Sequence, residues 1–101
     1  MSVKLSVVYD NPSDPAAFEK HYKEIHVPLA GKIPHVQRAE LAKVLPKEDG
    51  SPTPAYRLAE LYFPDYKTAC DAIASPEGKA TLADAQQLGS AGVKFLLSEI
   101  E

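Results

Sequence analysis

The sequence of 101 residues contains one cysteine, Cys70, and no tryptophan. A single cysteine cannot form a disulfide within the chain, and no cluster of cysteine and histidine residues has the spacing of a structural zinc site. Chains without disulfides are typical of a reducing compartment. These absences exclude a disulfide-stapled scaffold and predict a cytoplasmic protein.

Positive charge is sparse and dispersed, since 11 lysine and arginine residues stand against 14 aspartate and glutamate residues. Domains that bind nucleic acid concentrate basic side chains in a patch or stripe, which this sequence lacks. Long apolar runs are missing as well, because the run over residues 3–9 contains Lys4 and Ser6 and stops at Asp10. Such a run is too short for a signal peptide or a membrane span. We expect neither nucleic acid nor a membrane among the partners of this chain.

The chain does contain enough apolar residues for one hydrophobic core. Leucine, isoleucine, valine and phenylalanine make up 24 of the 101 residues, above the roughly 20% below which chains tend to stay disordered. At this length folding buries roughly 65% of the accessible surface, which suits a single core. Residues 1–101 are therefore expected to form one domain.

A helix is expected from residue 14 to about residue 29. The Asp14 carboxylate can accept hydrogen bonds from first-turn amides, and Pro15 suits a first helical position because no donor is needed there. Pro28 removes the hydrogen bond to the carbonyl of residue 24, so it is expected to kink the last turns. Four apolar side chains recur at spacings of four, three and four residues, which predicts one buried stripe: Phe18, Tyr22, Ile25 and Leu29.

The remaining elements follow from period-two alternation and turn signals. Strands are expected over residues 3–9, 35–45, 55–63 and 93–99, and helical segments over 64–74 and 75–88. A turn-rich segment, residues 46–54, makes the second and third strands a long-looped hairpin. This β-α-β-β-α-β order predicts an α+β, ferredoxin-like fold, in which a four-stranded antiparallel sheet carries its helices on one face.

The third expected strand is apolar on both faces. Ala59 and Leu61 share one face, whereas Tyr56, Leu58 and Tyr62 share the other. Helices cover only one face of the sheet in a monomer, and soluble monomers usually avoid a large exposed apolar patch. The pattern therefore predicts a homodimer in which a second copy covers the other face.

The densest group of reactive side chains is His21, Tyr22 and His26 in the first expected helix. At about 100° per residue, His26 lies about 60° from the centre of the apolar stripe and His21 about 80° away on its other side. Each is either a general acid or base beside a cleft or a structural histidine bonded to a backbone carbonyl. Tyr22 either belongs to the core or offers its hydroxyl to a ligand. Because the histidines are five residues apart, they are not the i, i+4 pair of helical metal ligands, and no metal is expected.

A second polar group is expected on the sheet. Arg38 and Glu40 share one face of the second strand, and Glu60 and Tyr62 share one face of the third. They form either a polar pocket, with Arg38, Glu60 and Tyr62 as substrate-binding residues, or ion pairs between strands or protomers. Alternation alone does not tell which face meets the helices. No glycine-rich phosphate loop or other cofactor motif is present, so no cofactor is predicted.

Several separated motifs resemble the EthD family of the dimeric α+β barrel superfamily. The first is Phe18-x-x-His21-Tyr22-x-x-x-His26-Val27-Pro28-Leu29-Ala30, followed by Ile33-Pro34. The likeness continues through residues 56–63, 74–78 and 83–84 and covers nearly the whole chain. The sequence departs from the pattern at His35, where the family often has glycine, so the resemblance implies no role for His35.

The resemblance implies a ferredoxin-like fold that pairs into a dimeric α+β barrel by packing two sheets face to face. The family's namesake is similar to an accessory protein encoded with a P450 system for ethyl tert-butyl ether degradation, and members are often labelled reductases. Similar proteins in the wider superfamily include muconolactone-type isomerases, polyketide-acting monooxygenases and cyclases, and haem-degrading enzymes. Many of these use a cleft between helices and sheet, which implies a small hydrophobic substrate.

Three functions remain as hypotheses. In the first, the protein is a cofactor-independent isomerase, cyclase or monooxygenase-like enzyme. His26 is then the general acid or base on an aromatic, lactone-like or ether-derived metabolite, and Tyr22 or Tyr62 orients a substrate oxygen. In the second, the protein carries a hydrophobic metabolite to an oxygenase system without changing it. In the third, it handles haem through His26 as an axial ligand.

Overall fold

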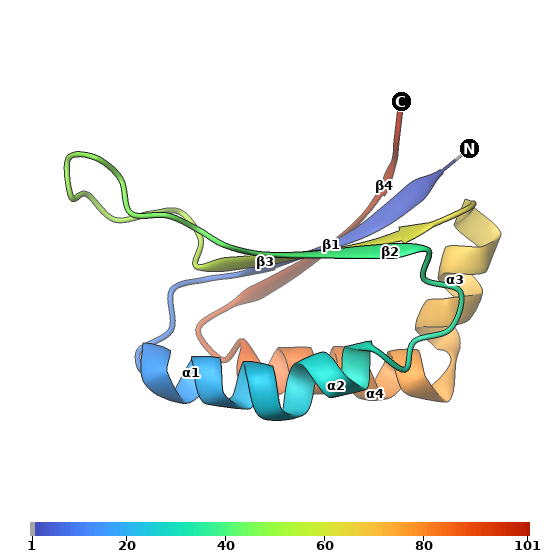
Figure 1. Ribbon diagram of the computed structural model, residues 1–101, viewed down its shortest axis with the longest axis horizontal. Helices are drawn as coiled ribbons and strands as arrows, with labels where there is room; N and C mark the ends of the chain where they lie inside the picture. Colours follow the sequence, from blue (N-terminus) through green and yellow to red (C-terminus); the bar gives the residue numbers. More distant parts are fainter. Residues whose placement is uncertain (1) are drawn as a thin grey trace.

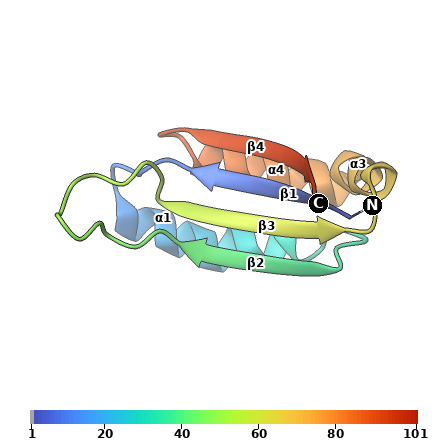
Figure 2. The same ribbon diagram turned by 90° about the horizontal axis from the view of Figure 1, so that it is seen from above.

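Four strands form one antiparallel sheet in the order β2-β3-β1-β4. The computed structural model describes residues 2–101, and its strands are β1 (Val3–Tyr9), β2 (Arg38–Lys43), β3 (Arg57–Phe63) and β4 (Val93–Glu99). All helices lie against one face of this sheet, and the other face is open (Figure 1). Seen from above, β2 and β4 are the two edges (Figure 2). The predicted α+β, ferredoxin-like class is confirmed.

The helices begin at the positions that the capping signals indicate. The first rod consists of α1 (Pro15–His21), the π-helical turn η1 (Tyr22–His26) and α2 (Val27–Ala30), and it is followed by α3 (Tyr66–Ala74) and α4 (Pro76–Leu88). The Asp14 carboxylate accepts a hydrogen bond from the amide of Ala17, and the Ser75 hydroxyl accepts one from the amide of Gly78. These side-chain caps satisfy first-turn amides that have no partner within the helix.

The middle hairpin is shorter in its strands than the sequence predicts. The second strand occupies Arg38–Lys43 rather than residues 35–45, and the third begins at Arg57 rather than residue 55. Single backbone hydrogen bonds continue the pairing by one residue at each end, from Gln37 to Tyr62 and from Val44 to Tyr56. The intervening loop projects past the helices at one end of the molecule (Figure 1).

His35 explains why the second strand does not begin at residue 35. Its φ is +66°, in the left-handed region that glycine adopts freely and other residues rarely occupy. The chain therefore turns at His35 before it enters the sheet. The glycine that the family often has at this position suits the same backbone conformation.

This conformation leads to a stability prediction. We expect His35→Val to lower the free energy of unfolding by about 1–3 kcal/mol, because a β-branched residue is strained at positive φ. His35→Gly should leave it unchanged or raise it by less than about 1 kcal/mol, since glycine relieves strain but gains entropy in the unfolded chain. Urea unfolding of both variants measures the difference. Equal stabilities would contradict a strained His35.

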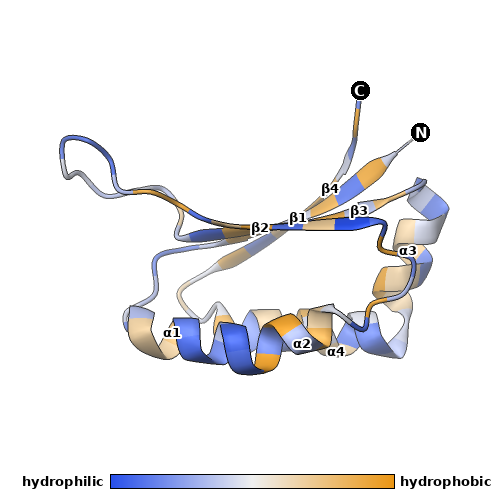
Figure 3. Ribbon diagram, viewed as in Figure 1, coloured by the Kyte–Doolittle hydropathy of each residue, from blue (hydrophilic) through white to orange (hydrophobic). Residues whose placement is uncertain are grey.

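The core lies between the sheet and the helices. The side chains of β1 that face the helices are buried, and so are Ala59, Leu61 and Phe63 of β3. Apolar and polar residues accordingly alternate along the strands (Figure 3). The buried residues of β1 are those that the alternation predicts: Val3, Leu5, Val7 and Tyr9.

The opposite face of the sheet is open and mixed in character. Leu96 is 51% exposed there, and Val8 and Leu58 lie opposite one another on β1 and β3. At one end of this face, the residues that lie opposite one another on neighbouring strands are polar. Arg38, Glu40, Glu60 and Tyr62 therefore share the open face rather than the core.

The predicted stripe of the first helix is wrong at Ile25. Phe18, Tyr22 and His26 are buried, whereas Ile25 is 48% exposed. The cause is the π-helical turn η1, in which the amide of Val27 bonds to the carbonyl of Tyr22, five residues back. A turn that contains an extra residue rotates all later side chains around the helix axis. His26 consequently takes the buried position that regular α-helical geometry assigns to Ile25.

Candidate functional site

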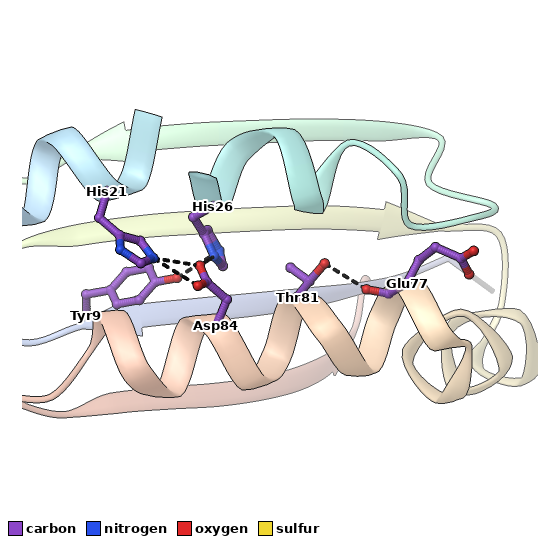
Figure 4. Close-up of polar contacts among 6 residues, drawn as sticks. All are labelled: Tyr9, His21, His26, Glu77, Thr81 and Asp84. Atoms are coloured by element: carbon purple, nitrogen blue, oxygen red, sulfur yellow. Dashed lines mark hydrogen bonds and ion pairs between the residues drawn. The ribbon is translucent and has the colours of Figure 1, made fainter. Parts of the chain in front are cut away.

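The π-helical turn also brings the two histidines of the first helix together. In a regular α-helix, residues five apart point about 140° away from each other. Here His21 and His26 both reach the same carboxylate, that of Asp84 on α4 (Figure 4). The turn ends at His26, two residues before Pro28, whose ring nitrogen carries no hydrogen for an intrahelical bond. The distortion expected near Pro28 therefore lies just before it and assembles the site.

Asp84 is the centre of a four-residue hydrogen-bond network. Nε2 of His21 is 2.9 Å from Oδ1 of Asp84, and Nδ1 of His26 is 2.8 Å from Oδ2. The network continues from Nε2 of His26 to the hydroxyl of Tyr9, at 3.2 Å. Only 11% of the Asp84 side chain and 8% of the His26 side chain are exposed, against 28% for His21. The network therefore leads from a partly exposed histidine into the core.

The chemistry of Asp84 determines where the histidine hydrogens lie. Burial alone raises the pKa of the Asp84 carboxyl, but hydrogen bonds from His21 and His26 outweigh it, so the pKa lies below its usual 3.8. An ionised carboxylate only accepts hydrogen bonds, so the facing nitrogen of each histidine carries a hydrogen. Neutral His26 is then protonated on Nδ1, and its Nε2 accepts the hydroxyl hydrogen of Tyr9.

Tyr9 stays protonated because it is fully buried. Burial, with smaller contributions from Tyr22 and Asp84, raises the pKa of the Tyr9 hydroxyl far above its usual 10.0. A phenol that keeps its proton is a hydrogen-bond donor at all ordinary pH values. Tyr9 therefore donates its hydroxyl hydrogen to the lone pair of His26 Nε2.

The raised pKa of Tyr9 predicts a loss of stability in alkaline solution. Above pH 10 the unfolded chain releases the Tyr9 proton but the folded protein keeps it, so the stabilisation present below pH 10 declines as the pH rises. One such group contributes about 1.4 kcal/mol per pH unit. Urea unfolding between pH 8 and pH 12 should therefore give a shallower decline for Tyr9→Phe than for the wild type. Identical declines would contradict the assignment.

Aromatic rings fix His26 on its other sides. Phe18, Tyr22 and His26 stack along the helix, with ring centroids 5.8 Å and 5.6 Å apart. The ring of Tyr9 lies edge-on to all three, at interplanar angles of 78–89°. Such arrangements are favourable for aromatic pairs and restrict ring rotation. His26 is thus held by packing as well as by hydrogen bonds.

An apolar pocket of about 340 Å³ lies beside His26, between the sheet and the helices. Its volume is in the range of small-molecule sites. Exposed Leu41 on β2 and Gly31 after α2 lie on its outer side, next to the edge of the sheet. The lining also includes His26, Tyr22, Val27, Ala59, Leu82 and Ala85.

Tyr22 lines the same pocket and is 2% exposed. Among the described residues, its hydroxyl has no hydrogen-bond partner, although a buried hydroxyl normally has one. The Arg57 guanidinium lies over its ring, 4.6 Å from the centroid, and is held there by two hydrogen bonds to Glu19. The Arg57 hydrogen bonds also hold the pKa of the Glu19 carboxyl below its usual value. Tyr22 therefore has a fixed ring and an unused polar group.

The structure separates the predicted site residues into two groups. His21, Tyr22 and His26 meet on the helix side of the sheet. Glu60 and Tyr62 lie on the open face, and Arg38 is on that face at the rim of the pocket. Tyr62 donates to Glu40, Arg38 covers the Tyr62 ring at 4.0 Å, and Glu60 pairs with Lys4. Of the ion pairs in this group, Lys4–Glu60 joins β1 to β3 and Arg38–Glu40 lies within β2, and the whole group is apart from the histidines.

Sequence reasoning missed two members of the network, Asp84 and Tyr9. Asp84 occurs within the family motif, but nothing in that motif connects it to the histidines. A signal does exist, because α4 buries Gly78, Thr81 and Ala85, and residue 84 borders this buried face. A carboxylate beside a buried face needs a partner, and the nearby helix contains histidines.

Neither a metal cluster nor a membrane-spanning helix occurs in the described part of the chain. Across residues 2–101, no group of three or more histidine, cysteine, aspartate or glutamate side chains is arranged to hold a metal ion. In the same residues, every helix is too short or too polar to cross a membrane. The two histidines and Asp84 are accounted for by their hydrogen bonds to one another.

Comparison with known proteins matches residues 11–88 to the EthD domain. An uncharacterized 11.0 kDa protein from the thcB-thcC intergenic region of Rhodococcus erythropolis is 44% identical over 98 residues, which are 97% of this chain and 94% of that protein. The crystal structure of an EthD family protein from Bacillus halodurans C-125 is 30% identical, with a TM-score of 0.92 over the whole of both chains.

More distant solved structures share the fold. A mutant form of SnoaB, a cofactor-independent oxygenase from Streptomyces nogalater, is 17% identical, with a TM-score of 0.66. The match covers 98% of this chain and 92% of SnoaB. Other structures of this fold are described as dimeric ferredoxin-like proteins of unknown function.

Proposed function

The chain belongs to the EthD family, and from that premise we propose that it binds a small apolar metabolite in the pocket beside His26. His26, supported by Asp84, is the general acid or base that acts on this ligand. The observation that carries the proposal is the 2.8 Å hydrogen bond between His26 and Asp84 at the wall of an apolar pocket. The reaction needs no cofactor in this proposal.

The size and lining of the pocket support an aromatic, lactone-like or ether-derived ligand. A volume of about 340 Å³ accommodates a compact ring compound, and the walls are largely aliphatic. Polar contacts are few, so a ligand with one or two oxygen atoms fits better than a highly charged one. The unpartnered hydroxyl of Tyr22 is suited to hold a ligand oxygen.

His26 has the features of a base for proton transfer. Its Nδ1 hydrogen is bound by Asp84, which stabilises the imidazolium that forms when Nε2 accepts a proton. Nε2 is bonded to Tyr9 at 3.2 Å, which is long for a hydrogen bond. In this proposal, a ligand hydroxyl or acidic C–H displaces this contact in order to reach Nε2. Proton transfer from ligand to Nε2 and back gives an isomerisation without any other reactant.

A carrier function is the second candidate, and the same contact favours it. Tyr9 occupies Nε2 of His26, so both ring nitrogens already have partners without a ligand. In a carrier the network only shapes the pocket, and the ligand leaves unchanged, for example to an oxygenase. The two candidates share the binding site and differ in turnover.

A ligand screen tests the proposed binding site. Wild type and His26→Ala are heated with lactones, phenols, polycyclic aromatics and haem. A ligand at 100 times its dissociation constant adds about 2.7 kcal/mol, which raises the melting temperature by roughly 10–20 °C in a domain of this size. We expect one class to stabilise the wild type and to lose most of this effect in His26→Ala. Absence of any shift would argue against a ligand site.

We also propose that the protein is a homodimer in which two open sheet faces pack together. Half-exposed Leu96, together with Val8 and Leu58, supplies an apolar area, and pairs such as Lys4 with Glu60 supply charges of both signs. Sedimentation should give twice the chain mass of 11.0 kDa for the wild type and the chain mass for Leu58→Asp. Ile25→Asp, on the helix side, is the control and should stay dimeric. A monomeric wild type contradicts this proposal.

A further inference from the structure

The proposed acid–base step does not use His21, yet the fold brings it to the same carboxylate as His26. Its Nε2 lies 2.9 Å from Oδ1 and 3.1 Å from Oδ2 of Asp84. The π-helical turn η1 begins directly after His21 and ends at His26. Such turns are rare, occur mostly as single turns and are frequent at functional sites. A single histidine would suffice to bind Asp84, so the second one requires an explanation.

The geometry of the Asp84 carboxylate explains why a second histidine is present. His26 uses Oδ2 of Asp84, and among the described residues the hydrogen bond to Oδ1 comes from His21. Without that donor, a largely buried acceptor is left unsatisfied, and the carboxylate is free to rotate about its Cβ–Cγ bond. Rotation would take Oδ2 away from Nδ1 of His26. The His21 contact therefore restrains the contact on which the proposed base depends.

We propose that His21 is a positioning residue that acts on His26 through Asp84. Its Nε2 hydrogen holds the carboxylate against Nδ1 of His26, which keeps the His26 hydrogen on Nδ1 and leaves Nε2 as an acceptor. This role rests on the proposed function, because positioning matters only if His26 acts as the base. The position of the hydrogen on the His26 ring, however, can be measured without any ligand.

A purely structural role for His21 makes a different prediction. The His21–Asp84 contact joins α1 to α4, so its loss would lower stability in either case. If His21 only joined the helices, the hydrogen on His26 would remain on Nδ1 in any variant that still folds. The tautomer of His26 therefore separates the two roles, whereas stability does not.

The test uses ring ¹⁵N spectra of histidine-labelled protein at pH 8. His35→Gln removes the signals of the third histidine and completes the assignment. We expect wild-type His26 to carry its hydrogen on Nδ1, and the fraction in this form to fall at least twofold in His21→Leu. His21→Gln should restore the wild-type signals of His26, because its amide also donates to Asp84. A folded His21→Leu with the wild-type His26 tautomer overturns the proposal.

Two further variants keep the result interpretable. If His21→Leu does not fold, His21→Asn replaces it, since its amide is too short to donate as the glutamine does; equal spectra for Asn and Gln overturn the proposal. Asp84→Asn separates this inference from the proposed function. If His26 keeps its tautomer in Asp84→Asn, Asp84 does not determine which ring nitrogen of His26 carries the hydrogen, and the proposed function fails at that point. If Asp84→Asn changes the tautomer and His21→Leu does not, only the role of His21 fails.

Discussion

Asp84→Asn is expected to lower the rate of proton transfer at His26 by about 10⁴-fold while the protein stays folded. An asparagine amide can donate a hydrogen bond to Nδ1 of His26, which moves the ring hydrogen to Nε2. Nε2 then no longer accepts a proton from the ligand. The same substitution in a serine protease triad produces the wrong histidine tautomer and a loss of this size. The rate is measured as solvent deuterium incorporated into a ligand that the screen identifies.

The control for this prediction is Asp71→Asn. Asp71 lies on α3 and pairs with Lys67 at the surface, where both side chains are mostly exposed. Surface pairs of this kind contribute little, so neither rate nor stability should change appreciably. A similar loss of rate in both variants would mean that the effect does not come from the histidine network. Full activity in Asp84→Asn would exclude His26 as the base that Asp84 supports.

Ala59→Phe is expected to reduce ligand affinity at least 100-fold, or about 2.7 kcal/mol. Ala59 lies on the central strand β3, is 8% exposed and lines the pocket from the sheet side. A phenylalanine ring at position 59 would occupy the volume that the ligand needs in the pocket. Because the ring fills an existing cavity, the free energy of unfolding should change by less than about 1 kcal/mol. Calorimetric titration with the ligand and urea unfolding measure the two effects.

Ala80→Phe is the matched control for the pocket. Ala80 is exposed on α4 and is not among the residues that line the pocket beside His26. The same increase in side-chain size should leave affinity within about twofold of the wild type. If Ala59→Phe binds as tightly as Ala80→Phe, the ligand binds elsewhere. If Ala59→Phe unfolds, Leu82→Trp tests the same space from the helix side.

Local sequence signals were sufficient for the fold. The alternation of Val3, Leu5, Val7 and Tyr9 predicted a strand with one buried face, and this is the burial observed. Asp14 caps the helix that it was expected to begin, and Ser75 caps the helix predicted over residues 75–88. These features depend on neighbouring residues and short-range geometry, which a single sequence contains. The family motifs led to the same architecture, which the EthD domain match and the structural comparisons support.

The arrangement of the site was less predictable, because it depends on one irregular turn. Regular α-helical geometry separates His21 from His26 and buries Ile25, whereas the π-helical turn exposes Ile25 and buries His26. Pro28 indicated a distortion but not its type. Asp84 is distant in sequence from both histidines, so only the packing of α4 against the first helix shows that they meet.

The polar residues of the sheet illustrate another limit. Alternation correctly grouped Glu60 with Tyr62, and Arg38 with Glu40, on shared faces. It did not determine which face met the helices, because apolar side chains occur on both faces of β3. The structure places this group on the open face, where Arg38 and Tyr62 both bind Glu40 and Glu60 pairs with Lys4. A role in substrate binding for Arg38, Glu60 and Tyr62 stays a prediction.

The most direct test of proton transfer at His26 is exchange of a bound ligand with solvent deuterium. A ligand that stabilises the wild type is incubated in D₂O with wild type, Asp84→Asn or buffer alone, and its deuterium content is followed by mass spectrometry. We expect the wild type to introduce deuterium at one position much faster than buffer, and Asp84→Asn to approach the buffer rate. Tight binding without exchange above the buffer rate would contradict catalysis by His26 and identify a carrier.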